Sequence, residues 1–368
     1  MPANMLDVVN LKKYFPVRQT IFEALRRRPM QHVKAVDDVS FSLAKGEVLA
    51  LVGESGCGKT TIARTLLGLE EATAGSILFN GQPVVAHERR RRTGVLSVET
   101  NTTPPRNMPE PAGIQSIMLK RLRQRAQLVF QDPYESLNPR ATILEIVSEP
   151  LEVHGLLRNP HERLQRVKTA LEEAGLRPAE DYYPRFPYEL SGGQRQRVVI
   201  AGALVLQPEL LIADEPVSML DVSIRADILN LLRGLRDSRG ISILFITHDF
   251  GTVAYFAERI AVMYLGRIVE LGATQAVLHN PQHPYTRALL SVVPVPNPRE
   301  RHERVILQGE TPNPIHIPTG CRFHPRCPIA IDRCKEIDPP FVEVSPSHQA
   351  ACLLASTPPS TDNPLPAP

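Results

Sequence analysis

The sequence predicts an α/β fold with a mostly parallel sheet that a helical segment interrupts. Short apolar runs typical of buried strands, such as residues 47–52 and 241–246, alternate with segments of helical periodicity. A glycine-rich turn follows the first of these runs, and a helix is expected to begin at Lys59. Strands that alternate with helices are typical of a parallel α/β core.

The other elements follow in chain order. Residues 7–11 and 36–43 read as strands, and 76–79 read as a strand that ends at the turn Asn80-Gly81. Helical periodicity dominates residues 143–175 and 193–206, so a helical subdomain of about 131–206 is expected. The remaining predicted elements are the strands 210–213, 241–246, 260–263 and 267–270, and the helices 224–236 and from 250 onward.

Two segments interrupt this order. Residues 88–118 are polar, contain proline and lack periodicity, so we expect a disordered insertion there, with order resuming at 125–130. A second proline-rich stretch begins at Pro294, and residues 354–368 read as a disordered tail.

Composition limits the partners of the chain. Its 368 residues carry a net charge of only +3, which does not favour nucleic acid as the main partner. No stretch reaches the roughly 18 to 20 apolar residues that span a bilayer, and the N-terminus lacks the apolar core of a signal peptide. We therefore expect a soluble, cytoplasmic chain that works at a membrane only by docking on other subunits.

A phosphate-binding loop is predicted at residues 53–60, which read Gly-Glu-Ser-Gly-Cys-Gly-Lys-Thr between a strand and a helix. Glycines let backbone N–H groups turn toward phosphates, and a helix N-terminus adds positive potential. Lys59 can reach the β- and γ-phosphates, and Thr60 offers a hydroxyl to Mg²⁺. The predicted ATP-binding residues are Gly53, Glu54, Ser55, Gly56, Cys57, Gly58, Lys59, Thr60 and Thr61.

Two carboxylates complete such a site. Residues 210–213 form a buried strand, and Asp214 and Glu215 follow at its carboxyl end, where open α/β sheets bind ligands. Asp214 is predicted to hold Mg²⁺, and Glu215 to orient and deprotonate the attacking water.

A second anion cradle is predicted at Ser191-Gly192-Gly193-Gln194, which opens a helix. One chain does not need two cradles for one γ-phosphate. The second cradle is therefore expected to serve a nucleotide held by another subunit.

With these motifs in order, the sequence resembles an ABC-transporter nucleotide-binding subunit. By this resemblance, Gln131 matches the loop glutamine that senses Mg²⁺ and the membrane subunit, and Asp221 matches the loop that communicates across the dimer. His248 matches the switch histidine on the γ-phosphate. Phe15 or Tyr14 is the candidate aromatic that stacks on adenine, with Phe15 preferred. The implied catalytic set is Glu215, His248, Lys59 and Gln131, and the implied Mg²⁺ set is Thr60, Gln131 and Asp214.

The oligopeptide/dipeptide importer branch is similar in further segments: Gln131-Asp132-Pro133-Tyr134, residues 263–270, and residues 280–290 with His283-Pro284-Tyr285-Thr286. The closest resemblance is to the second ATPase of the importer pair. It implies a P-loop NTPase of the ABC cassette type, with a helical subdomain, an antiparallel β subdomain and a small Cys-containing C-terminal extension. The implied domains are 1–290 for nucleotide binding and 291–353 for the extension.

The resemblance implies an ATPase that powers import of di- or oligopeptides, with ATP and Mg²⁺ as cofactors. It implies a second ATPase subunit in a heterodimer, two membrane permease subunits and, indirectly, a substrate-binding protein, with the chain peripheral on the cytoplasmic face of the inner membrane. Nickel or glutathione remains an alternative cargo, because the branch also includes such importers.

Three other classes of protein fit the sequence less well. A DNA-repair or translation ATPase would carry a coiled-coil insertion or tandem cassettes, an exporter would carry fused membrane helices, and a non-catalytic scaffold is disfavoured by Glu215 and His248. The chain departs from the family at Gly202, where arginine is usual, and at Met219, where a smaller residue is usual. Glycine weakens a helix by about 1 kcal/mol relative to alanine.

Four of the five cysteines cluster near the C-terminus: Cys321, Cys327, Cys334 and Cys352. Disulfides are disfavoured in cytoplasm, so the cluster indicates a metal, and four thiolates can hold zinc or an iron–sulfur cluster. The importer branch implies [4Fe–4S] with a structural role. Zinc and the absence of any metal remain open alternatives.

Overall fold

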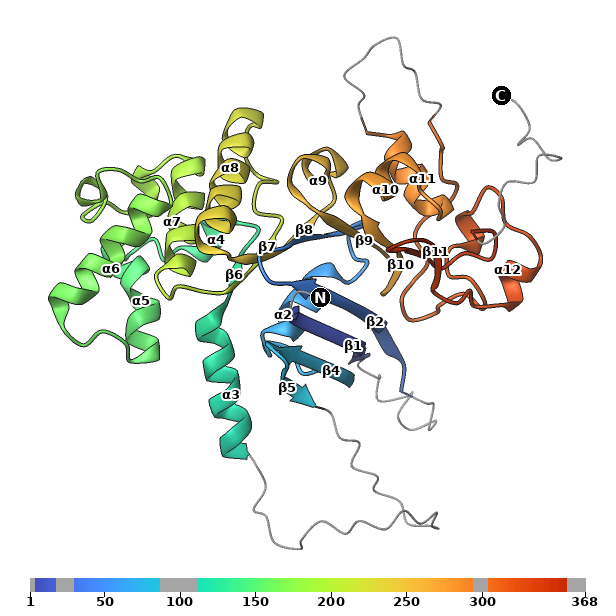
Figure 1. Cartoon of the computed structure of the whole chain (residues 1–368), viewed down its shortest axis with the longest axis horizontal. Coiled ribbons are helices and arrows are strands. Elements are labelled where there is room, and N and C mark those ends of the chain that lie inside the picture. The colour runs from blue at the N-terminus through green and yellow to red at the C-terminus, as the bar shows by residue number, and fades with distance from the viewer. Residues whose placement is uncertain (1–3, 18–29, 87–111, 294–303, 356–368) are drawn as a thin grey trace, which may run out of the picture.

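The computed structural model describes residues 4–17, 30–86, 112–293 and 304–355. Its centre is an 8-stranded sheet in the order β11-β12-β10-β9-β3-β8-β7-β6 (Figure 1). The five strands from β9 to β6 run parallel, which confirms the predicted core. They are β3 (Val48–Val52), β6 (Ala126–Val129), β7 (Leu210–Asp214), β8 (Ser242–Thr247) and β9 (Arg259–Tyr264).

A second, antiparallel sheet has the order β2-β1-β4-β5. Its strands are β1 (Asn4–Pro16), β2 (His32–Ala44), β4 (Ala74–Phe79) and β5 (Gln82–Ala86), so the first two are longer than predicted. Apolar residues from this sheet, from helix α2 (Lys59–Leu66) and from the central sheet form one buried cluster. The cluster fixes the amino end of α2, and with it the phosphate-binding loop.

The helical subdomain lies at one end of the central sheet, on the left in Figure 1. Its helices are α4 (Pro133–Ser136), α5 (Ile143–His154), α6 (Pro160–Glu173) and α7 (Gly192–Leu204), with the short 3₁₀ turns η1 (Ala179–Asp181) and η2 (Pro187–Glu189). A capping box between Thr142 and Glu145 begins α5, and Gly155 in the left-handed region ends it. Val147, Val167 and Val198 join these helices in a second buried cluster. Helices α8 (Val222–Arg239) and α9 (Phe250–Phe256) follow β7 and β8.

Helix α3 (Ala112–Arg125) corrects the predicted disorder of residues 88–118. Residues 112–118 are helical, whereas 87–111 lie outside the described residues. The helix is anchored at its carboxyl end, because Leu122 is buried and Arg123 donates hydrogen bonds to the carbonyls of Leu67 and Gly68, at 3.0 and 2.8 Å. Contacts between such distant segments cannot be predicted from the periodicity of the local sequence.

The C-terminal extension does not stand apart from the cassette. After β10 (Arg267–Ala273), α10 (Thr274–His279) and α11 (Pro284–Ser291), the chain reaches η3 (His324–Arg326), α12 (Arg333–Glu336), β11 (Val342–Ser345) and β12 (His348–Ala350). Strand β12 pairs with β10 and so extends the central sheet. Phe323 packs its ring against Tyr264 and Tyr285, with centroids 5.2 and 5.4 Å apart. The predicted tail of 354–368 lies outside the description from residue 356 on.

Within the described parts of the chain, none of the helices combines the length and the hydrophobicity that a membrane crossing requires.

Candidate nucleotide site

The phosphate-binding loop joins β3 to α2 in a shape that requires glycine at two positions. A Cβ atom on Gly53 would lie 2.2 Å from the carbonyl oxygen of Met263. Gly58 has a φ of 110°, and a Cβ atom there would lie 2.1 Å from the carbonyl oxygen of Ala35. The loop therefore packs directly on neighbouring backbone, where any side chain would clash.

Hydrogen bonds fix the conformation of the loop. Lys59 is 6 % exposed, and its Nζ donates to the carbonyls of Gly53 and Glu54 at 2.7 and 3.0 Å. The N–H of Glu54 donates to Oη of Tyr285 at 2.9 Å. Cys57 is buried, and this burial raises the pKa of its thiol, which fits a structural role for that side chain.

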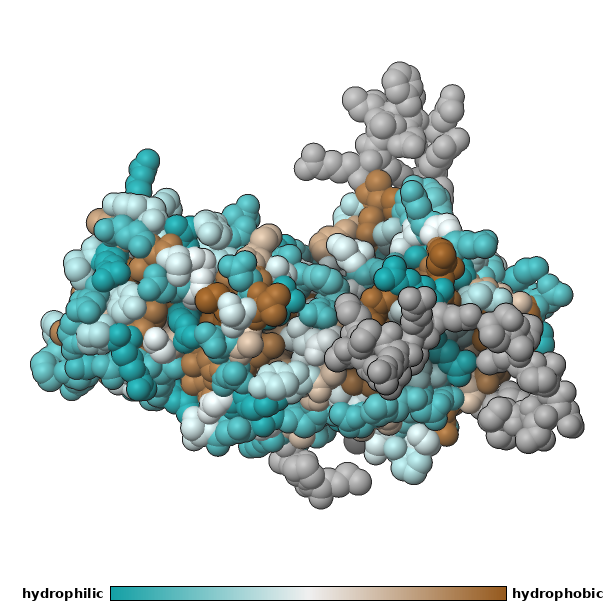
Figure 2. All heavy atoms as spheres, turned by 90° about the horizontal axis from the view of Figure 1, so that it is seen from above, coloured by the Kyte–Doolittle hydropathy of each residue, from teal (hydrophilic) through white to brown (hydrophobic). Residues whose placement is uncertain are grey.

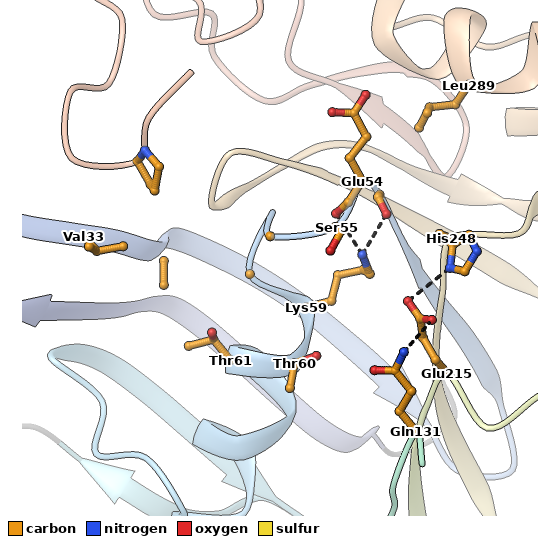
Figure 3. A pocket seen from close by; sticks show the side chains of 15 residues that line it. Val33, Glu54, Ser55, Lys59, Thr60, Thr61, Gln131, Glu215, His248 and Leu289 are labelled. Carbon is orange, nitrogen blue, oxygen red and sulfur yellow. Dashed lines mark hydrogen bonds and ion pairs between the residues drawn. The ribbon is translucent and has the colours of Figure 1, made fainter. Parts of the chain in front are cut away.

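A cavity of about 610 Å³ opens in front of this loop (Figure 3). Four of its lining residues, Val33, Ala35, Leu289 and Pro314, have no counterpart among the predicted site residues. The predicted residues that line it are Gly53, Glu54, Ser55, Gly56, Gly58, Lys59, Thr60, Thr61, Gln131, Glu215 and His248. Eleven positions from four separate stretches of sequence thus converge on one cavity.

Glu215 lies between the side chains of Gln131 and His248 (Figure 3). Gln131 Nε2 donates to Oε2 of Glu215 at 3.3 Å, and Nδ1 of His248 lies 3.1 Å from Oε1. The backbone of Glu215 has a φ of 48°, an uncommon value for a side chain of this size. The Glu215 N–H donates to the Ile246 carbonyl at 2.9 Å, and the Ser218 hydroxyl donates to the Glu215 carbonyl at 3.0 Å. These bonds hold the carboxylate toward the cavity.

Asp214 has donor chemistry suited to its predicted role toward Mg²⁺, although it is not among the residues that line the cavity. It is 6 % exposed, and its Oδ1 is buried without a hydrogen-bond partner among the described residues. Burial, together with the Glu215 charge, raises the pKa of this carboxyl, while Thr60 and Lys59 act against the rise. An unpaired buried carboxylate oxygen beside the Thr60 hydroxyl is the donor chemistry that a hard cation prefers.

The second cradle lies away from this cavity. Ser191 caps α7: its Oγ accepts from the Gln194 N–H at 3.3 Å, while its own N–H donates to Oε1 of Gln194 at 3.0 Å. None of the residues 191–194 lines the cavity. Gly193 packs against α8, where an added Cβ atom would lie 2.6 Å from Cγ2 of Ile224. Asp221, at the start of α8, is exposed.

The candidate adenine aromatic is not among the cavity-lining residues. Phe15 pairs with Val33 of the neighbouring strand, and Val33 does line the cavity. The ammonium of Lys13 lies 4.6 Å from the centre of the Phe15 ring. Tyr14 donates its hydroxyl to Asp37 instead. The stacking role of Phe15 stays a prediction.

The four C-terminal thiols share one region of the extension. Burial raises the pKa of Cys321 to about 11, and Cys334, Cys352 and Cys327 add to this rise. The Cys321 N–H donates to the Cys334 carbonyl at 2.9 Å. Nevertheless, across residues that the structure describes, no group of three or more His, Cys, Asp or Glu side chains is arranged to hold a metal ion. In this conformation, the thiols do not fit a metal centre.

Sequence reasoning missed the contribution of the extension to this site. Arg326 donates to both carboxylate oxygens of Glu54, and Thr311 donates to one of them. Pro314 lines the cavity and accepts a hydrogen bond from the Lys34 N–H at 3.2 Å. These residues lie more than 250 positions beyond Glu54, as the separations of 257 and 272 for Thr311 and Arg326 show. No local pattern marks such contacts.

Comparison with known proteins identifies the protein family. Residues 36–218 match the family described as ABC transporter, and residues 269–334 match the one described as oligopeptide/dipeptide transporter, C-terminal region. Among solved structures, the ATP-binding cassette MJ0796, a dimer bound to ADP and Pi, is 25 % identical with a TM-score of 0.56, over 73 % of this chain and 99 % of that one. The cbiO1 protein of Clostridium perfringens is 26 % identical with a TM-score of 0.57, over 76 % and 92 %.

Curated relatives narrow the assignment. The oligopeptide transport ATP-binding protein AppF of Bacillus subtilis is 45 % identical over 96 % of this chain and 98 % of its own length. The dipeptide transport ATP-binding protein DppF of Haemophilus influenzae is 43 % identical over 95 % and 96 %. The chain therefore belongs to the ABC-transporter ATP-binding proteins of the oligopeptide/dipeptide branch. It is an ABC-type ATPase, in which ATP hydrolysis is coupled to transport.

Proposed function

We propose that this subunit hydrolyses ATP to power import of di- and oligopeptides across the cytoplasmic membrane. The observation that carries the hydrolytic part is the placement of Glu215 between Gln131 and His248 at the cavity. The peptide cargo is supported by the match of residues 269–334 and by the names of the curated relatives. Nickel or glutathione is the alternative cargo, since no residue of this chain contacts the transported molecule in the proposed assembly.

The site residues divide the chemistry among them. The loop N–H groups and Lys59 bind the phosphates, and Glu215 accepts the proton of the attacking water. His248 contacts Glu215 at the carboxylate oxygen that Gln131 does not contact, and it orients both Glu215 and the γ-phosphate. Thr60, Asp214 and Gln131 would hold Mg²⁺, which neutralises charge on the β- and γ-phosphates when bound.

The position of the second cradle supports a two-subunit site. Ser191 and Asp221 are exposed, and the cradle does not line the cavity of its own chain. In the proposed assembly, residues 191–194 contact the nucleotide of a second ATPase subunit, in a heterodimer. Asp221 contacts that partner across the interface.

Further subunits complete the importer in this proposal. The surface is mostly hydrophilic in the view of Figure 2, with separate hydrophobic patches. Phe130 and Tyr134, which lie close to Gln131 along the chain, are exposed. Tyr188 is also exposed, and Arg195 contacts both the Tyr134 ring and the Tyr188 carbonyl. We assign this region to contacts with two permease subunits, which receive cargo from a substrate-binding protein. The chain then lies peripherally on the cytoplasmic face of the membrane, with 1–290 as nucleotide-binding domain and 291–353 as extension.

A [4Fe–4S] cluster on Cys321, Cys327, Cys334 and Cys352 is a separate part of the proposal, and it requires the four thiols to take an arrangement different from the one in this structure. Its support is chemical: four thiols gathered in one small region. No step of the mechanism passes through it. Elemental analysis of protein purified without oxygen tests it, and a content of iron and zinc well below one equivalent contradicts any metal there.

Uptake in the native cell tests the proposed function. Cells that carry Glu215→Gln are compared with normal cells, using labelled di- and oligopeptides, nickel and glutathione. We expect peptide uptake alone to collapse. Loss of nickel or glutathione uptake with normal peptide uptake would show that the transported cargo is nickel or glutathione and not peptides. The catalytic assignment is tested separately, by mixing Glu215→Gln with normal partner subunits: unchanged ATP turnover would refute it.

A further inference from the structure

The phosphate-binding loop of this chain carries a carboxylate of its own. Glu54 directly follows Gly53, lines the nucleotide cavity together with Lys59, and has a side chain that is 27 % exposed. The phosphates of ATP bring several negative charges into the same cavity. An unbalanced Glu54 carboxylate would repel them, and it would attract the Lys59 ammonium that the phosphates need.

The C-terminal extension supplies the balancing charge. Arg326 forms a two-pronged pair with Glu54: its two terminal nitrogens donate to Oε2 and Oε1 at 2.9 and 3.1 Å. The Thr311 hydroxyl donates to Oε2 at 2.7 Å. Paired hydrogen bonds between a guanidinium and a carboxylate fix both position and orientation.

The pair is sheltered from water. The Arg326 side chain is 9 % exposed, and its guanidinium carbon lies 5.9 Å from the centre of the Tyr264 ring. Burial acts to raise the pKa of Glu54, but the hydrogen bonds from Arg326 and Thr311 outweigh it and hold that pKa below its usual range. Glu54 is therefore ionised, and Arg326 balances its negative charge.

Other contacts bring the same stretch of the extension to the site. Pro314 lines the cavity together with Val33 and Ala35, and its carbonyl accepts from the Lys34 N–H at 3.2 Å. Arg322 donates to the Leu265 carbonyl at 2.7 Å and pairs with Asp37 of β2. Residues 311–326 thus touch the nucleotide site from the phosphate loop to the second strand.

We propose that Arg326 is a positioning residue for ATP, because it neutralises Glu54 and keeps that carboxylate away from Lys59. Through Arg326, the C-terminal extension contributes to nucleotide binding. This goes beyond the proposed transport function, because it concerns nucleotide affinity and holds whichever cargo is carried.

Nucleotide binding by the full-length chain tests this. The dissociation constant of a fluorescent N-methylanthraniloyl ATP with Mg²⁺ is measured by titration for each variant. We expect Arg326→Gln to raise it about tenfold, the size of one charge-assisted hydrogen-bond pair. The double variant Glu54→Gln/Arg326→Gln should return to within about twofold of the parent, because the uncompensated charge is gone. A purely structural role for Arg326 predicts no such rescue.

The controls separate affinity from folding. Lys335→Gln removes a positive charge from the same extension, at an exposed pair with Asp332, and should leave the dissociation constant unchanged. Thermal unfolding is recorded for every variant, and Thr311→Val, which removes a single hydrogen bond to Glu54, serves as the milder variant if Arg326→Gln does not fold. Parent-like affinity in the folded Arg326→Gln variant, or in Thr311→Val where only that variant folds, overturns the proposal. A double variant as weak as Arg326→Gln also overturns it.

Discussion

Nδ1 of His248 lies 3.1 Å from Oε1 of Glu215, although the two residues follow different strands of the central sheet. Strands β7 and β8 run parallel and adjacent, so their carboxyl ends present both side chains to the same cavity. His248 is largely exposed, with 60 % of its side chain accessible, whereas Glu215 is 16 % exposed. The histidine can thus reach a nucleotide while its ring stays beside the predicted base.

The first prediction concerns this pair. In the assembled transporter, His248→Ala should lower the kcat for ATP about a hundredfold and change nucleotide affinity far less. His161→Ala, an exposed histidine of α6, is the matched control. If the two residues act as a unit, adding Glu215→Gln to His248→Ala should cost little more than Glu215→Gln alone. Full additivity of the two losses would argue against a shared role.

The second prediction concerns the buried pair of Asp37 and Arg322. Their side chains are 7 % and 8 % exposed, and Tyr14 also donates to Asp37. Asp37→Asn should destabilise the protein by about 3 kcal/mol, since it leaves a buried guanidinium without its counter-charge. Urea unfolding measures the change. Asp332→Asn, at an exposed pair, should have almost no effect.

The same pair sets a pH dependence. Burial acts to raise the pKa of Asp37, but hydrogen bonds from Tyr14 and Arg322 together with the nearby charges lower it overall. A lowered folded-state pKa contributes stability that is complete above the unfolded value of about 3.9 and is lost as the pH falls through the folded value. The stability difference between the parent and Asp37→Asn should therefore be constant from pH 5 to 7 and shrink below about pH 4. A difference that shrinks only toward neutral pH would contradict this assignment.

The third prediction uses three glycines in helices. A Cβ atom on Gly202 of α7 or on Gly234 of α8 would meet nothing within 4 Å. Alanine at either position should stabilise the protein by up to about 1 kcal/mol through helix propensity. Gly193→Ala should destabilise it, because its Cβ atom would lie 2.6 Å from Ile224. Thermal unfolding of the three variants gives the comparison, and a loss of stability in Gly202→Ala would show that the glycine has another purpose.

The fourth prediction concerns the anchor of the extension. Glu270 is fully buried in β10 and accepts hydrogen bonds from the N–H groups of Gln282 and His283 at 2.7 and 3.0 Å. Nε2 of His348 in β12 lies 2.7 Å from the same carboxylate. Glu270→Ala should cost about 3 kcal/mol or more, because buried polar groups lose their acceptor. Hydrogen exchange should then speed up in β12 before the parallel strands, while the exposed Glu310→Ala leaves exchange unchanged.

Several parts of the fold were predictable because their signals are local. The apolar runs that became β3, β7 and β8 are short, continuous and bounded by turn residues, so their burial follows from composition. The helix at Lys59 follows from the glycine-rich turn before it. The length of β1, by contrast, depends on its pairing with β2. Residues 112–118 form the first part of α3, and the other end of this helix is held by hydrogen bonds from Arg123 to the carbonyls of Leu67 and Gly68. Contacts between distant segments decide both cases.

By itself, the sequence determined which residues are predicted for the nucleotide site. Lys59 stands in a phosphate-loop motif, and Asp214, Glu215 and His248 stand at or just after the carboxyl ends of strands. Only the tertiary structure decided what surrounds them. The pairing of β12 with β10 and the contact of Arg326 with Glu54 bring the C-terminal extension onto the phosphate loop. A linear pattern cannot contain such a relation, because charge pairing and burial depend on distance in space and not on separation along the chain.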